Sequence, residues 1–98
     1  MDEERRLAVL APEMSRTTVD LLRRVVGVEP AERIPAEALA TADRVLAQHG
    51  ADGLRLLTMG LCGWAAVLIE QDAKMSGRTY EAVLDDIDLT CIESHAEN

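Results

Sequence analysis

The feature that most constrains the fold is an apolar run of fourteen residues from Leu56 to Ile69, LLTMGLCGWAAVLI. The run shows no alternation of apolar and polar residues, and it is longer than an ordinary buried strand. Leu, Met and Ala make up half of it, and these residues favour helix. The sequence therefore predicts one helix over about residues 52–75, with Asp52 near the N-terminus, where the helix dipole favours a negative charge.

A helix that is apolar on every side is normally a buried central helix. A membrane span needs roughly 20 apolar residues, so the run is too short and no membrane span is predicted. Gly60 and Gly63 lie inside the run, and each costs about 1 kcal/mol relative to Ala in a helix interior. Together with Ala66 they leave one side of the helix nearly smooth, so another backbone can approach closely. That backbone belongs either to a neighbouring helix of the same chain or to a second copy of the protein.

The N-terminal third contains a proline within a helical pattern. The apolar residues keep one heptad-like register across Pro12, although a proline inside a helix removes a hydrogen bond and clashes with the preceding turn. The sequence predicts either two nearly coaxial segments or one kinked helix over residues 2–26. Gly27 follows as the C-terminal stop.

Two more helices are predicted, one on each side of the apolar run. The first covers residues 35–49, with Gly50 as its stop. The second covers about residues 79–89, with Thr79 as its N-cap. An apolar stripe marks its expected inner face, at Tyr80, Val83, Leu84, Ile87 and Cys91.

Length and composition support a single small domain of the all-α class. The chain has 98 residues, no Phe, one Trp and one Tyr, so the core must consist of Leu, Val, Ala, Ile and Met. The predicted fold is a small four- to five-helix bundle around the central hydrophobic helix at about 52–75. Residues 1–98 form one domain in this prediction, and the acidic tail at 93–98 is expected to fray.

The cysteine content indicates a reducing compartment. Cys62 and Cys91 are too few for a disulfide framework, and both are expected to be buried thiols because free Cys behaves as a small hydrophobe. No secretory signal is recognisable at the N-terminus, so a cytoplasmic location is expected. Nine Arg against one Lys, with abundant Ala, is typical of a GC-rich bacterial genome.

Charge is distributed unevenly along the chain. The net charge is −8, and six acidic residues without a base lie in residues 79–98. Three of them, Asp85, Asp86 and Asp88, lie near the C-terminal end of the last predicted helix, which disfavours anions. They form a solvated face that keeps the protein soluble, or they pair with Arg5, Arg6, Arg23 or Arg24 of the same chain, or they provide a surface for a basic partner. A further alternative is a divalent metal site built from Asp85, Asp88 and either Glu93 or His95.

The sequence does not support an enzyme, a metalloprotein or a nucleic-acid-binding protein. No paired Ser/His/Asp or Cys/His arrangement and no glycine-rich phosphate loop is present, so no enzyme and no cofactor are predicted. His49 ends a predicted helix, where a dipole-stabilised histidine is favoured over a metal ligand. The negative net charge argues against nucleic-acid binding, which needs a basic surface.

The remaining interpretation is an acidic helical module that binds another protein, itself, or both. Self-association is expected at Gly60, Gly63, Trp64 and Val67 on the central helix. If the chain itself covers that helix, the acidic residues of the last helix become the expected partner surface. The alternative is a small apolar ligand held between helices, in a pocket lined by Met59, Trp64 and Met75.

Overall fold

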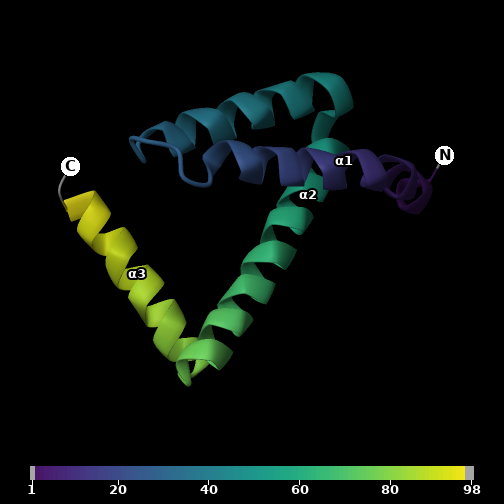
Figure 1. The fold of residues 1–98 in the computed structure, drawn as a ribbon. Coiled ribbons are helices and arrows are strands. Elements are labelled where there is room, and N and C mark those ends of the chain that lie inside the picture. The colour runs from purple at the N-terminus through teal and green to yellow at the C-terminus, as the bar shows by residue number, and fades with distance from the viewer. Residues whose placement is uncertain (1, 97–98) are drawn as a thin grey trace. The chain divides into compact units, whose positions relative to one another are not determined.

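A computed structural model describes residues 2–96 and confirms the all-α class (Figure 1). In this range it contains three helices: α1 (Glu3–Val25), α2 (Arg33–Ser76) and α3 (Tyr80–Ala96). The prediction of four to five helices is therefore wrong. Pro12, where the sequence allowed a helix to end, lies within a continuous helix, whereas Gly50 has a non-helical backbone at a kink inside α2.

Helix α1 runs through Pro12 without interruption. It begins after Asp2, whose side chain caps the helix by accepting a hydrogen bond from the backbone N–H of Arg5 at 2.8 Å. It ends at Val25, and Gly27 follows with a φ of 76°. Gly27 is thus the stop that the sequence predicted, because a positive φ is accessible to glycine at little cost.

Helix α2 joins two predicted helices across a kink at Gly50, where φ is 68° and ψ is −157°. Three residues later, the backbone of Gly53 lies so close to the preceding segment that an added Cβ would be 2.7 Å from Val45 Cγ1 and 2.8 Å from His49 Cβ. The kink therefore depends on two glycines in different ways. Gly50 supplies the backbone conformation, and Gly53 permits the close approach.

The chain comprises two compact units, and the boundary between them falls after Cys62. In the N-terminal unit, the first part of α2 runs antiparallel to α1 and beside it (Figure 1). The core of this unit contains Met14 and Leu21 from α1, with Val45 and Leu57 from α2 on either side of the kink. The single domain predicted for residues 1–98 remains a prediction.

The C-terminal unit begins at Gly63 and contains the end of α2 and all of α3. Gly77, with a φ of 67°, ends α2, and the N–H of Arg78 reaches back to the carbonyl of Ala73 at 3.0 Å. This is the bond that closes a glycine-terminated helix. The Thr79 hydroxyl accepts from the N–H of Ala82 at 3.1 Å, as the predicted N-cap should.

Helix α3 is longer than predicted. It continues to Ala96 rather than ending near residue 89, so residues 93–96, which were expected to fray, are helical. Residues 97–98 of the predicted frayed tail lie outside the described residues.

Candidate interaction surfaces

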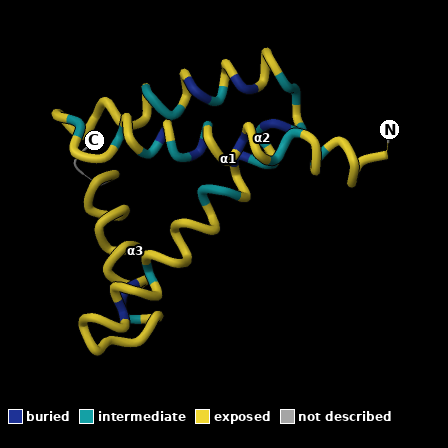
Figure 2. Tube along the Cα trace, turned by 45° about the vertical axis from the view of Figure 1, so that its right-hand side comes forward, coloured by how far each residue is buried: buried dark blue, intermediate teal, exposed yellow. Residues whose placement is uncertain are grey.

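The apolar run of α2 is covered by its own chain mainly at its beginning. Leu57 is in the core of the N-terminal unit, and Leu56 and Leu61 pack against that core. Beyond Cys62 the helix is mostly exposed (Figure 2). The expectation of a central helix buried along its length is not met in the C-terminal unit, because α3 covers this part of α2 only in part.

The C-terminal unit exposes a large apolar surface. Within residues 63–95, only Ala73 and Val83 are buried. The large apolar side chains that are exposed there are Trp64, Val67, Leu68, Met75, Tyr80, Leu84, Ile87, Leu89 and Ile92. So many exposed large apolar side chains in one small unit are uncommon on a monomeric protein, and large exposed apolar patches mark sites where another molecule binds.

The two glycines of the apolar run have different neighbours. A Cβ added to Gly60 would lie 2.7 Å from Oγ1 of Thr18, so α1 of the same chain already occupies the space beside Gly60. A Cβ added to Gly63 would meet nothing within 4 Å. The expected self-association face is thereby reduced to Gly63, Trp64 and Val67, because a second backbone cannot reach Gly60 without displacing Thr18.

These three residues lie close together on α2. Gly63 and Val67 are one turn apart, and Trp64 is three residues before Val67, so they share a face of the helix. Trp64 is 49% exposed and Val67 is 41% exposed. Glu70 and Lys74 line a shallow hollow beside Val67, so this face, which we call the α2 face, carries charges of both signs.

A groove with a volume of about 420 Å³ opens between α2 and α3 in the C-terminal unit. Its apolar lining comes from Leu68 and Ile69 on α2 and from Val83, Ile87 and Cys91 on α3. Val83 is buried while Ile87 and Cys91 are exposed. The stripe predicted as the inner face of the last helix is therefore covered at Val83 and open beyond it.

The charged residues of the groove are all acidic. Asp72 and Asp86 line it together with Thr90. Asp86 forms an ion pair with Arg78, with 2.7 Å between Oδ2 of Asp86 and Nη2 of Arg78. Nη2 of Arg78 also donates a hydrogen bond to the carbonyl of Ala82 at 2.8 Å. Of the three predicted acidic residues, only Asp86 lines the groove. Asp85 and Asp88 are exposed elsewhere on α3.

The described residues contain no group of three His, Cys, Asp or Glu side chains that could hold a metal ion. His49 instead contacts Glu13 of α1, with 3.3 Å between Nε2 and Oε1. Cys62 and Cys91 are free and exposed. The prediction of buried thiols is therefore wrong, because the part of α2 and α3 that carries them is not covered.

The expected ligand pocket is not formed from the predicted residues. Met59 lines a separate hollow of about 260 Å³ against α1, beside Met14 and Thr18. Trp64 and Met75 do not line the groove between α2 and α3, and Met75 is 88% exposed. The three side chains thus do not converge on one site.

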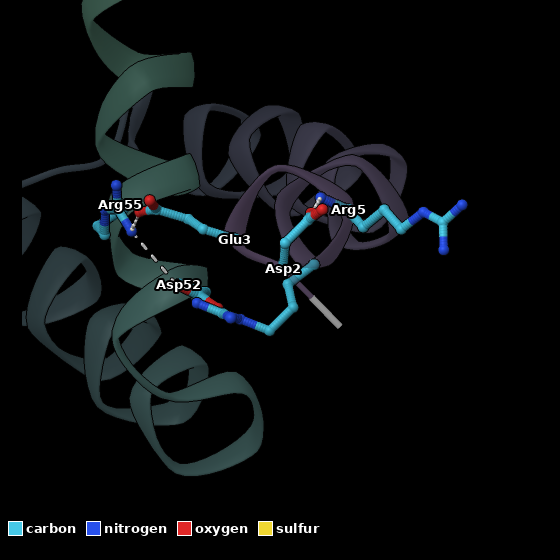
Figure 3. A network of polar contacts seen from close by, with 6 residues as sticks. Asp2, Glu3, Arg5, Asp52 and Arg55 are labelled. Carbon is cyan, nitrogen blue, oxygen red and sulfur yellow. Dashed lines mark hydrogen bonds and ion pairs between the residues drawn. The ribbon is translucent and has the colours of Figure 1, made fainter.

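A polar network joins the start of α1 to α2 just beyond the kink (Figure 3). Arg55 pairs with Glu3 and, at 3.4 Å, with Asp52, while Arg6 Nε lies 3.0 Å from Asp52 Oδ2. The hydrogen bond and charge of Glu3 raise the pKa of Arg55 above its ordinary value. All these groups are in the N-terminal unit, where they connect α1 to α2.

By length and composition, α2 is one helix that could cross a membrane. The most apolar stretch of 18 residues has a mean hydropathy of 1.4, and 11% of it is buried. A mostly buried core helix of a soluble protein and a signal sequence near an N-terminus meet the same criteria. No model of a protein family, no curated protein and no solved structure matches the chain.

Proposed function

We propose that this protein is a small helical interaction module that self-associates through the α2 face. The observation that carries the proposal is the open space at Gly63, beside Trp64 and Val67, on a helix that its own chain leaves uncovered. A helix without a Cβ at its contact point allows a second backbone to approach closely. Trp is also the side chain most often found at the energetic centre of protein interfaces.

The charges around the α2 face are compatible with a second copy. A two-fold interface brings the same surface of two chains together, so a face of one sign repels itself. The α2 face carries both Glu70 and Lys74, and a symmetric contact can place opposite charges near each other. The acidic residues of α3 all carry the same sign, so a symmetric contact through them would place like charges near each other.

A protein partner is favoured over a lipid bilayer by the packing of α2. The apolar run extends for about 21 Å at 1.5 Å per residue, whereas the hydrocarbon core of a bilayer is about 30 Å thick. Its first part, at Leu57, is in the core of the N-terminal unit, and Arg55 just before it pairs with Glu3. Insertion of the run into a membrane would therefore require the N-terminal unit to open.

Native mass spectrometry of the full chain tests the proposal. We expect a dimer at twice the chain mass of 10.7 kDa. Gly63→Leu places a large side chain in the contact and should shift the population to monomer. Ala65→Leu is the matched control: it adds leucine at an exposed position of the same helix, turned about 200° away from Gly63, and it should remain dimeric.

A wild-type chain that is monomeric at high micromolar concentration contradicts self-association. So does a Gly63→Leu variant that dimerises like the wild type. Flotation of the wild-type chain with vesicles of neutral lipid would show instead that a bilayer covers the apolar surface.

A further inference from the structure

The groove between α2 and α3 has a different chemistry from the α2 face. We propose that it is the docking site for an amphipathic helix of another protein, one that carries Lys or Arg beside its apolar stripe. The proposal extends the interaction function to a second surface. It does not require the chain to be a dimer, because the two surfaces share no residue of α2. The surfaces adjoin at Trp64 and Leu68, which are one turn apart, and they diverge from Val67 to Ile69, over which the helix turns by about 200°.

The shape of the groove fits a helix. On its α3 side the apolar residues follow each other at turn spacing, from Val83 through Ile87 to Cys91, which spans about 12 Å along the helix. Leu68 and Ile69 form the opposite wall on α2. An amphipathic helix presents apolar side chains at positions i, i+3 or i+4, and i+7, so two turns of such a helix match this length.

The charge of the groove selects among possible occupants. The lining contains two ionisable carboxylates, Asp72 and Asp86, and no basic side chain. Asp86 is paired with Arg78 from outside the lining, so Asp72 is the carboxylate left to pair with an incoming base. The sequence from Gly63 onward contains eight acids against two bases, Lys74 and Arg78, and Arg78 is already bound to Asp86. A helix with basic flanks therefore gains favourable pairing at the groove, and one with acidic flanks is repelled.

The same charges disfavour a second copy of the chain in the groove. In a symmetric contact, Asp72 and Asp86 of one chain would approach the carboxylates of the other. Like-charge contacts of this kind suppress incorrect partners. The mixed charges of the α2 face favour self-association there, whereas the acid-only groove favours a basic partner.

The test uses three designed peptides of 18 residues. The first has Leu at i, i+3, i+4 and i+7 and Lys at its other positions. The second has the same Leu stripe with Glu in place of Lys. The third has the composition of the first in a scrambled order without a stripe. Binding of each fluorescently labelled peptide to the full chain is measured by anisotropy at 50 and 300 mM NaCl.

We expect the basic striped peptide to bind, and the scrambled peptide to bind about tenfold more weakly or worse, which corresponds to about 1.4 kcal/mol. The acidic peptide should show no binding. Salt should weaken binding of the basic peptide without abolishing it, because the charges are screened and the apolar contact is not. Equal binding of the scrambled and striped peptides would overturn the proposal, since charge alone would then explain it. Equal binding of the acidic and basic peptides would overturn it as well.

Variants locate the site with matched controls. Ile87→Glu places a charge in the groove and should weaken binding of the basic striped peptide at least about tenfold, whereas Ile92→Glu makes the same change at an exposed position of α3 outside the lining. Asp72→Lys should weaken binding more than Asp88→Lys, although both change the net charge equally. If Ile92→Glu weakens binding as much as Ile87→Glu, and Asp88→Lys as much as Asp72→Lys, the groove is not the binding site.

The peptide-binding measurements are repeated on Gly63→Leu, so that failure of the self-association proposal can be distinguished from failure of the groove proposal. Peptide binding that is unchanged in this variant supports an independent groove. Loss of dimer mass in Ile87→Glu, with no peptide binding to the wild type, would show that a second copy occupies the groove and would overturn the assignment of a basic partner.

Discussion

The two ends of the apolar run in α2 have different surroundings. At Leu57 the helix is packed against Met14 and Leu21 in the N-terminal unit. Beyond Gly63 the same helix, with equally apolar residues, is largely exposed. The difference does not come from residue type, since Leu and Val occur on both sides of the boundary. It comes from what packs on the helix within each unit: α1 and the first part of α2 in the N-terminal unit, and α3 alone in the C-terminal unit. The exposed half therefore remains available to another molecule.

The largest effect is expected from two methionines that differ in burial. Met14→Ala removes a side chain that is 2% exposed and should lower the free energy of unfolding by about 2–5 kcal/mol, because it leaves a cavity in the core. Met75→Ala makes the same change at an 88% exposed position and should change stability by less than about 0.5 kcal/mol. Urea unfolding measures both values. Similar losses for the two variants would mean that the C-terminal unit is packed as tightly as the N-terminal one.

Two glycines three residues apart should respond with opposite signs. Gly60→Ala brings a Cβ against the buried Thr18, whose hydroxyl is already bound to the carbonyl of Met14 at 2.8 Å. We expect overpacking to outweigh the gain in helix propensity and to lower stability by about 1–2 kcal/mol.

Gly63→Ala meets nothing within 4 Å and should raise the stability of the monomer by up to about 1 kcal/mol. Urea unfolding is followed at concentrations where each variant is monomeric by light scattering. A gain in stability from Gly60→Ala would show that Thr18 moves aside easily and that α1 does not fill this space.

The smallest effect is expected in the polar network. Asp52→Asn weakens contacts to Arg6 and Arg55 and should lower stability by about 0.5–1 kcal/mol, because such pairs are close to solvent. The loss should shrink in 1 M NaCl, where the Debye length is about 3 Å. Asp20→Asn breaks a more exposed pair with Arg23, and thermal unfolding should show no measurable change for it.

The helix ends that could be predicted from the sequence depend on local chemistry. Gly27 and Thr79 end or begin a helix through their own backbone or side chain, and the structure confirms both. Gly50 could not be assigned in the same way, because a glycine with positive φ permits either a stop or a kink. The kink depends on the contact between Gly53 and Val45, which is a tertiary contact between two segments.

The candidate surfaces were predictable only in part. The proposed contact residues Gly63, Trp64 and Val67 follow from the apolar run itself, and the stripe at Val83 and Ile87 follows from helical spacing. The exclusion of Gly60 could not be predicted, because it requires knowing that Thr18 of α1 lies beside it. The groove could not be predicted either. It depends on how far α3 covers α2 beyond the turn, and spacing along one helix does not contain that information.

Hydrogen–deuterium exchange over a dilution series tests the central claim most directly, that a second chain covers the exposed half of α2. We expect amides around Gly63 and Val67 to exchange more slowly as the concentration rises through the dimer transition. Amides around Met14 and Val45 should show protection that is independent of concentration. Exchange around Gly63 that stays fast at every concentration, or protection there that persists in a dilute monomer, would contradict the account.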